Sequence, residues 1–174
     1  MTIMKRHIVL ITGGQRSGKS GYAQKLALSL SPNPVYLATS RIWDEEFRRR
    51  VERHQRDRGP EWTNIEEEKF LSRHCLEGRV IVIDCVTLWG TNFFFDNKSD
   101  VELSLSLLKN EFDKFTDQEA CFIFVTNELG MGGISADELQ RKFTDMLGWA
   151  NQYIASKADE VILMVSGIPI KIKE

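Results

Sequence analysis

Five short apolar segments recur along the chain, and each is nearly continuous rather than alternating with polar residues. They are rich in β-branched and aromatic residues and lie at His7–Thr12, Val35–Thr39, Val80–Val86, Cys121–Thr126 and Val161–Val165. Strands show this pattern when both faces of their sheet are buried, which is typical of parallel sheets. The sequence therefore predicts a mostly parallel central sheet built from these segments.

Apolar residues between these segments recur at helical spacing. The helix expected at Gly18–Ser31 carries Tyr22, Leu26 and Leu30 on one stripe. Two further stripes follow Ser99 and Ser135, and they consist of Val101, Leu105, Leu108, Phe112 and Phe115, and of Leu139, Phe143, Met146, Ala150 and Tyr153. We expect capping boxes at Ser99–Glu102 and Ser135–Glu138, where these two helices begin.

Strands that alternate with such helices predict βαβ units and an open α/β sheet with flanking helices. The last segment, Ser166–Lys173, alternates apolar and basic residues after a Gly-Ile-Pro break. This is typical of an edge strand, so we expect a C-terminal antiparallel hairpin. No repeat, low-complexity tract or linker divides the sequence, which favours a single domain over residues 1–174.

Composition excludes several classes of protein. The chain has 23 basic and 25 acidic residues and a net charge of −2, so no global basic field indicates nucleic acid or an anionic membrane as a partner. Its three cysteines argue against a disulfide framework or a zinc site. Cys85 and Cys121 lie inside apolar segments, where cysteine behaves as a small hydrophobic residue. No apolar stretch is long enough to span a bilayer, and we expect a cytoplasmic protein.

The strongest motif follows the first predicted strand. The residues Gly13, Gly14, Gln15, Arg16, Ser17, Gly18, Lys19 and Ser20 match the phosphate-binding loop G-x-x-x-x-G-K-[ST]. The glycines let backbone N–H groups surround phosphates, Lys19 brings a cation to the β- and γ-phosphates, and the Ser20 hydroxyl reaches Mg²⁺. The helix that follows points its positive end at the same anion. These features predict a P-loop nucleotide-binding protein.

A second candidate for the metal site is Asp84, which ends the apolar segment from Arg79. A carboxylate at the end of such a strand holds Mg²⁺ directly or through water in P-loop proteins. Ligands of open α/β sheets also lie at these strand ends. We therefore expect Ser20 and Asp84 to share a magnesium ion, with a direct nucleotide contact of Asp84 as the alternative.

The segment Arg41–Arg58 is highly charged and contains one histidine, His54. Three Glu–Arg pairs at i,i+4 spacing favour a helix, namely Glu45–Arg49, Glu46–Arg50 and Glu52–Arg56. His54 continues the apolar stripe of Trp43, Phe47 and Val51, so we expect it to face the protein body. Spacing alone favours a packing role for this histidine. The nearby arginines suit phosphate binding, and an imidazole can instead be a covalent nucleophile towards a nucleotide α-phosphate.

Several ordered blocks resemble the cobinamide kinase/cobinamide-phosphate guanylyltransferases of cobalamin biosynthesis. The blocks are Ile11–Ser20, Tyr36–Ser40, Arg50–His54, Trp62 with Glu66, Ile83–Trp89, Thr91-Asn92, Val125–Gly132 and Val165–Lys171. They cover nearly the whole chain in the order of the family, and the set is more specific than any one block.

The resemblance implies a bifunctional enzyme. Such an enzyme phosphorylates adenosylcobinamide with ATP or GTP, and then transfers GMP from GTP to that phosphate to give adenosylcobinamide-GDP and pyrophosphate. It implies that His54 carries the guanylyl group, with Lys19 as the other catalytic residue. The implied nucleotide contacts are Gly13–Ser20, Ala38, Thr39, Ser40, Gln55, Arg56, Asp57, Arg58, Glu66 and Asp84. The resemblance also implies a homotrimer.

Two other functions compete with this interpretation: a P-loop kinase of a small metabolite with a structural His54, and a non-catalytic GTP-binding module. No Asn-Lys-x-Asp motif for reading guanine occurs in the sequence.

Arg41–Arg58 is expected to act as a lid, since the histidine must reach the α-phosphate. Glu128 ends a strand where a substrate could bind. The aromatic run Phe93–Phe95 suits core packing, a subunit contact or the corrinoid site.

Overall fold

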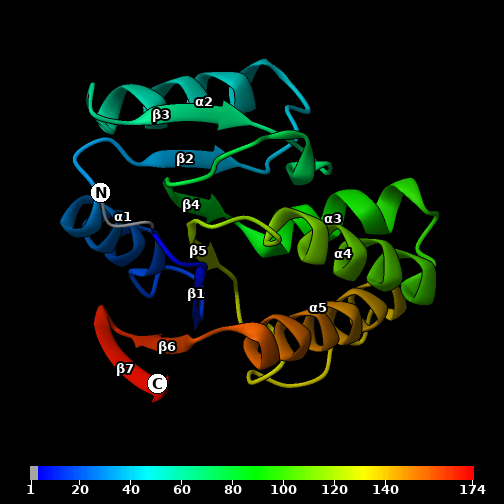
Figure 1. The fold of residues 1–174 in the computed structure, drawn as a ribbon. Coiled ribbons are helices and arrows are strands. Elements are labelled where there is room, and N and C mark those ends of the chain that lie inside the picture. The colour runs from blue at the N-terminus through cyan, green and yellow to red at the C-terminus, as the bar shows by residue number, and fades with distance from the viewer. Residues whose placement is uncertain (1–3) are drawn as a thin grey trace.

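A computed structural model describes residues 4–174 of the chain (Figure 1). A seven-stranded sheet has the order β3-β2-β4-β5-β1-β6-β7. Its strands are β1 His7–Gly13, β2 Val35–Ala38, β3 Thr63–Glu66, β4 Val80–Asp84, β5 Cys121–Val125, β6 Glu160–Val165 and β7 Ile168–Lys173. Neighbouring strands are parallel from β3 to β6, and only β6 and β7 are antiparallel. The predicted sheet and its C-terminal hairpin are confirmed.

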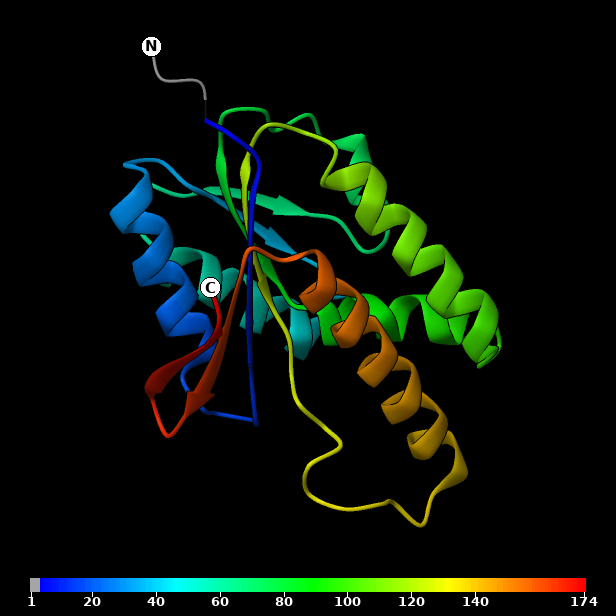
Figure 2. The same cartoon turned by 60° about the horizontal axis from the view of Figure 1, so that its bottom comes forward.

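The helices are α1 Lys19–Leu30, α2 Glu45–Asp57, α3 Val86–Asp96, α4 Val101–Phe115 and α5 Glu138–Lys157, with one 3-10 turn at Leu71–Arg73. Figures 1 and 2 show α3, α4 and α5 on one face of the sheet, α1 on the other face, and α2 beside the β3 edge. The central strands are therefore covered on both sides.

The apolar core consists of two clusters, one on each face of the sheet. In β5, Phe122 and Phe124 belong to the cluster under α3, α4 and α5, whereas Ile123 and Val125 belong to the cluster under α1. Successive side chains of a strand point to opposite faces, so a strand buried on both sides has no polar positions. This is the physical reason for the continuous apolar segments in the sequence.

Helix starts were predicted less accurately. The cap of α4 is Asp100, whose Oδ1 accepts a hydrogen bond from the Leu103 N–H at 2.9 Å, and the cap of α5 is Asp137, which accepts from the Gln140 N–H at 2.7 Å. The capping boxes expected at Ser99 and Ser135 are therefore wrong. An aspartate is as good a cap as serine and adds a negative charge at the positive helix end.

The buried stripe of α1 also differs from expectation. Ala23 and Ala27 form its buried face, Tyr22 and Leu26 lie at the side, and Leu30 is 51% exposed. Small residues let the helix approach the sheet closely, and this displaces the larger side chains to the flanks. The apolar stripes predicted for α4 and α5 do face the core, except that Leu139 in the first turn of α5 is 42% exposed.

Two elements were missed in the sequence. β3 is a short edge strand without buried side chains, so it leaves no apolar segment. The apolar segment expected to run to Val86 ends as a strand at Asp84, and α3 begins at Val86. This helix buries Phe93 and Phe94 in the core and leaves Phe95 49% exposed, which identifies core packing as the role of the first two aromatic residues.

Cys85 and Cys121 are buried and Cys75 is exposed, and all three are free thiols. The two buried cysteines therefore act as small core residues, as expected. None of the helices in residues 4–174 is long and apolar enough to cross a membrane.

The core makes one stability prediction. Phe112 of α4 is fully packed, with ring centroids 5.2 Å from Phe124 and 6.0 Å from Tyr153. We expect Phe112→Ala to lower the free energy of unfolding by about 3–5 kcal/mol, because it removes buried apolar area and leaves a cavity. Urea denaturation measures this, with the half-exposed Leu107→Ala on the same helix as the control. Similar losses for the two variants would contradict the assigned packing.

Candidate nucleotide site

The loop between β1 and α1 has the backbone conformation that its glycines allow. Gly18 is the residue before the helix and has a φ of 93°, in the left-handed region. A Cβ at Gly13 would lie 2.6 Å from the Met164 carbonyl oxygen, and one at Gly18 would lie 3.2 Å from Gly167 Cα. Gly167, in the turn of the C-terminal hairpin, also donates its N–H to the Ser17 carbonyl at 2.9 Å. The hairpin therefore braces the phosphate loop.

Lys19 is held inside this loop. Its side chain is only 7% exposed, and Nζ donates to the Gly14 carbonyl at 2.5 Å and to Ser17 Oγ at 3.4 Å. Burial lowers the pKa of Lys19 below its ordinary value, and the charge of Asp84 opposes that shift. The ammonium group thus lies inside the loop, where a phosphate surrounded by the backbone N–H groups would meet it. Gln15 and Arg16 lie exposed at the top of the loop.

Asp84 gathers two hydroxyl groups at the end of β4. Its Oδ2 accepts a hydrogen bond from Ser20 Oγ at 2.7 Å and one from the Tyr36 hydroxyl at 2.6 Å. Burial, followed by the charge of Asp84, raises the pKa of Tyr36, so the phenol stays protonated as a donor. The expected proximity of Ser20 and Asp84 is therefore present. Tyr36 was not assigned from the sequence, because a tyrosine in an apolar strand gives no separate signal.

The donor set of Ser20 and Asp84 fits Mg²⁺. Both offer hard oxygen atoms at one point, and Mg²⁺ in nucleotide sites binds one or two such groups together with substrate phosphates and water. Within residues 4–174 no group of three or more His, Cys, Asp or Glu residues could hold a metal ion. A cation here would depend on the oxygens of a bound nucleotide.

None of the residues of the charged helix α2 is buried, and polar contacts hold its C-terminal end. Gln55 Nε2 donates to Glu66 Oε1 at 2.7 Å. Arg58 follows the helix and donates twice to Asn64 Oδ1, at 2.9 and 2.7 Å, while its guanidinium lies 3.7 Å from the centre of the Tyr36 ring. Burial lowers the pKa of Arg58 below its ordinary value. These contacts fix the end of α2 to β2 and β3.

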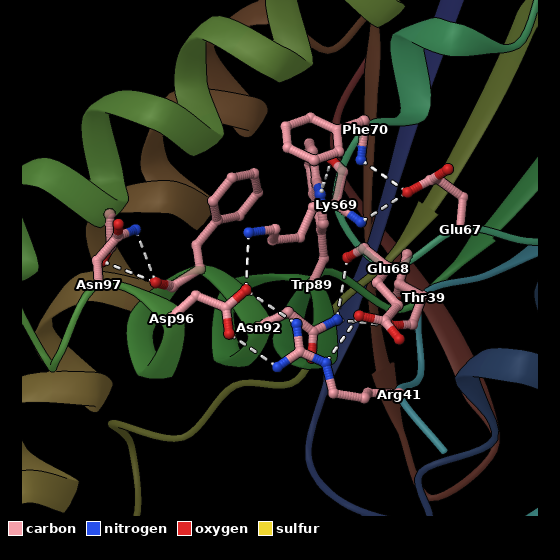
Figure 3. Close-up of polar contacts among 12 residues, drawn as sticks. Thr39, Arg41, Glu67, Glu68, Lys69, Phe70, Trp89, Asn92, Asp96 and Asn97 are labelled. Atoms are coloured by element: carbon pink, nitrogen blue, oxygen red, sulfur yellow. Dashed lines mark hydrogen bonds and ion pairs between the residues drawn. The ribbon is translucent and has the colours of Figure 1, made fainter. Parts of the chain in front are cut away.

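A second polar network fixes the segment that leads into α2 (Figure 3). Arg41 forms two hydrogen bonds with the Asp96 carboxylate, at 2.8 and 2.9 Å, and one with Glu68 at 2.7 Å. The Asp96 carboxylate also pairs with Lys69 at 2.7 Å. Hydrogen bonds from Arg41 and then Lys69 hold the pKa of Asp96 well below its ordinary value. The helix is thus anchored before it begins and after it ends, with few contacts between.

The ion pairs expected along α2 form only in part. Arg50 pairs with Glu46 at 2.8 Å, as predicted. Glu45 pairs with Arg48 at 3.4 Å instead of Arg49, and Arg56 Nε donates to the Glu52 backbone carbonyl at 3.4 Å instead of its carboxylate. Exposed pairs of this kind contribute little, so their partners are easily exchanged.

The anchoring of α2 can be tested. We expect Arg58→Ala to raise amide hydrogen exchange within residues 45–57 about tenfold, because it removes hydrogen bonds to a charged group worth about 1.5 kcal/mol. Mass spectrometry of exchanged peptides measures the change, with the exposed Arg48→Ala as the control. Equal exchange in both variants would show that Arg58 does not hold the helix.

A pocket of about 410 Å³ lies between α2 and the ends of the central strands. It is lined by Ser20, Gln24, Tyr36, Ala38, Ser40, Phe47, Arg50, Val51, His54, Asp57, Arg58, Asp84 and Leu88. His54 shares the pocket face of α2 with Phe47 and Val51, yet it is exposed rather than packed in the protein body. The pocket therefore joins an accessible imidazole to the side-chain oxygens of Ser20 and Asp84.

Other residues expected at the site are placed differently. Ala38, Ser40, Asp57 and Arg58 line the pocket. Gln55 and Glu66 do not line the pocket and form a hydrogen bond with each other. Arg56 faces an open surface elsewhere on α2.

Thr39 turns away from the pocket. Its buried hydroxyl donates to the Cys85 carbonyl at 2.7 Å and accepts from the Cys85 N–H at 2.9 Å. Arg50 and Gln24 were not assigned from the sequence, since charged or polar residues on an exposed helix rarely identify a site by themselves.

Comparison with known proteins gives a consistent result. Residues 9–172 match the family described as cobinamide kinase / cobinamide phosphate guanyltransferase. The bifunctional adenosylcobalamin biosynthesis protein CobU of Escherichia coli (strain K12) is 35% identical, over 95% of this chain and 99% of that protein. The corresponding protein CobP of Pseudomonas aeruginosa is 33% identical, over 94% and 96%. These matches cover essentially the whole of both relatives.

A solved structure supports the fold. The chain is similar to an ATPase from the type III secretion system of pathogenic bacteria, with a TM-score of 0.58 and 12% sequence identity over 91% of this chain and 51% of that one. A likeness at this low identity bears on the fold alone and agrees with a P-loop NTPase architecture.

Proposed function

This chain belongs to the cobinamide kinase / cobinamide phosphate guanyltransferase family, and from that premise we propose how its residues divide the two reactions. The enzyme is a bifunctional kinase and nucleotidyltransferase of adenosylcobalamin biosynthesis, and nucleoside triphosphates and cobinamide are its substrates. The phosphate loop serves both reactions, and His54 serves only the second. The observation that carries this proposal is the single pocket shared by His54, Ser20 and Asp84.

In the kinase step the phosphate loop holds the β- and γ-phosphates of ATP or GTP. Lys19 and the backbone N–H groups of the loop neutralise charge on the transferred phosphoryl group. Ser20 and Asp84 would hold Mg²⁺, which when bound shields the charge of the phosphate oxygens. The hydroxyl of adenosylcobinamide attacks the γ-phosphorus, and the nucleoside diphosphate leaves.

In the second step an imidazole nitrogen of His54 attacks the α-phosphorus of GTP. The bond from that phosphorus to the β-phosphate oxygen breaks, and pyrophosphate stays in the phosphate loop until it leaves. A phosphate oxygen of adenosylcobinamide phosphate then attacks the guanylyl phosphorus, which frees His54 and gives adenosylcobinamide-GDP. Arg50 and Arg58 line the pocket and stabilise the charge on the phosphates. A covalent intermediate divides one displacement into two in-line steps.

The sparse contacts of α2 support its role as a lid. His54 stands on the one helix of the site with no buried residue, so a small rotation would bring the imidazole to the α-phosphate at little energetic cost. The anchors at Arg41 and Arg58 limit this motion to the helix itself.

Several expectations stay predictions. They are the single domain over residues 1–174, a homotrimer, a cytoplasmic location and the absence of a nucleic-acid partner. The generic metabolite kinase and the non-catalytic GTP-binding module are not favoured, because the family performs both reactions.

The direct test is to incubate the protein with α-³²P-GTP and Mg²⁺ and to separate it on a denaturing gel. We expect a covalent label that is stable in alkali and lost in acid, as for a phosphorus–nitrogen bond. Mass spectrometry of peptides should place the added GMP on His54. A protein that binds GTP but acquires no label would contradict the covalent route, and a label on another residue would contradict the assignment of His54.

A further inference from the structure

The kinase step needs an acceptor that reaches the γ-phosphate, and this requirement rests on the function proposed above. Phosphoryl transfer is roughly in line, so the attacking oxygen must approach the γ-phosphorus opposite the leaving diphosphate. In the proposed guanylyl transfer, the α-phosphate of the nucleotide lies in the pocket with His54. The acceptor must therefore reach the phosphate loop from a different side.

A second groove borders the same phosphate loop. It has a volume of about 490 Å³ and is lined by Gly13, Gly14 and Ser17 of the loop, by Glu128, Met131 and Gly132, and by Leu163–Ser166 at the end of β6. None of these residues lines the pocket with His54. Figure 2 shows that the chain between β5 and α5 swings out in a wide loop here. Both cavities border the phosphate loop, one at Ser20 and the other at Gly13, Gly14 and Ser17.

Glu128 connects this groove to the phosphate loop. Its N–H donates to the Gly13 carbonyl at 2.9 Å, which continues the β1–β5 pairing beyond the bond from the Thr126 N–H to the Ile11 carbonyl. Its Oε1 accepts from the Gly130 N–H at 2.7 Å. Among residues 4–174 its Oε2 has no hydrogen-bond or ion-pair partner. Glu128 thus lines the same groove as Gly13 and Gly14 of the phosphate loop, and its Oε2 is free to accept a proton.

The rest of the groove is apolar and lies under a glycine-rich loop. Leu163 and Val165 form one wall, and Met131, which is 81% exposed, forms the opposite rim. The loop Gly130–Gly133 contains three glycines, so it can adapt to a ligand. Methionine is flexible and adapts well to bulky apolar surfaces.

We propose that this groove binds the hydroxyl-bearing arm of the corrinoid and the adjoining apolar surface of its ring, and that Glu128 accepts the hydroxyl proton in the kinase step. The hydroxyl oxygen forms a bond to the γ-phosphorus, and the bond from that phosphorus to the β-phosphate oxygen breaks. The nucleoside diphosphate leaves with the bonding electrons, and the hydroxyl proton passes to Glu128 Oε2. Glu128 is then a catalytic residue, and Met131 contributes to corrinoid affinity.

The same groove explains how one chain serves two acceptor reactions. After phosphorylation the corrinoid carries its phosphate at the phosphate loop. Once pyrophosphate has left that loop, this phosphate can enter it from the groove and face the guanylyl group on His54. The corrinoid therefore needs no second binding site for the guanylyl transfer.

The first test is Glu128→Gln, which preserves size and removes the proton acceptor. We expect kcat of the kinase step to fall about 10²–10⁴-fold, the usual contribution of a general base. The covalent label from α-³²P-GTP should stay within twofold of wild type, because that step needs no corrinoid. An unchanged kinase kcat would overturn the role of Glu128. If the wild-type protein acquires no covalent label from α-³²P-GTP either, the result would instead count against the proposed function.

The second test uses two exposed residues of one loop. Met131→Asp places a charge on the rim of the groove, whereas Ile134→Asp places the same charge three residues away, at a side chain that is 90% exposed and does not line the groove. We expect the first variant to raise KM for the corrinoid at least tenfold and the second to leave it within twofold, with KM for the nucleotide unchanged in both. Equal KM values, or a changed oligomeric state of Met131→Asp in light scattering without a change in KM, would overturn the docking site.

Discussion

Replacing His54 with alanine is expected to abolish the guanylyltransferase reaction and to leave the kinase reaction nearly intact. Removing a covalent nucleophile costs on the order of 10⁴-fold or more in rate, and no other histidine lines the pocket. His54 is exposed and contributes no buried contact, so its loss should not unfold the protein. The phosphate loop, Ser20 and Asp84 stay in place for phosphoryl transfer.

Three measurements check this expectation. They are the rate of adenosylcobinamide phosphate formation, the rate of adenosylcobinamide-GDP formation, and the covalent label from α-³²P-GTP. His74→Ala is a suitable control, because His74 is a histidine near Glu67 that does not line the pocket. A variant without His54 that still forms adenosylcobinamide-GDP at wild-type rate would show that the guanylyl group does not pass through this residue.

Replacing Lys19 with methionine is expected to impair both reactions. The β- and γ-phosphates occupy the phosphate loop in each step, as a donor in the kinase step and as the leaving group in the guanylyl step. Loss of one fixed cation or donor at developing charge costs about 10²–10³-fold in kcat. Methionine keeps the length and the apolar stem of the side chain, so the buried space stays filled.

The control for this variant is Lys25→Met, an exposed lysine on the same helix α1. Thermal unfolding of both variants checks that the fold persists. A Lys19→Met enzyme that keeps either reaction at the wild-type rate would show that the phosphate loop does not serve that reaction. Together, the two variants distinguish His54, which serves only the guanylyl transfer, from Lys19, which serves both reactions.

The fold could be predicted from the sequence wherever burial of a strand on both faces produced a continuous apolar segment. The five apolar segments all became strands of the central sheet, because a strand covered by helices on both sides has apolar side chains at every position. Strands at the edge of the sheet show no such apolar segment. β3 pairs through its backbone and exposes its side chains, so only the position of β2 beside it reveals it as a strand.

Local chemistry in the loops was also visible in the sequence, to different extents. The phosphate-loop motif was recognisable in the sequence, since it needs glycines and a lysine at fixed spacing. The helix caps were misplaced, because several residues near each start can accept the same hydrogen bond and the backbone decides which one does. In the structure, Asp100 and Asp137 are the residues that accept it.

By itself, the sequence determined the P-loop, the parallel sheet and the resemblance that singled out His54, because each depends on residues close together along the chain or on their order. Only the tertiary structure decided which of these residues meet. It turned Thr39 towards Cys85 and brought Tyr36 and Arg50 into the pocket. It also placed Glu128 beside Gly13. Contacts between segments far apart in the chain depend on strand order and helix packing, and neither leaves a local pattern in the sequence.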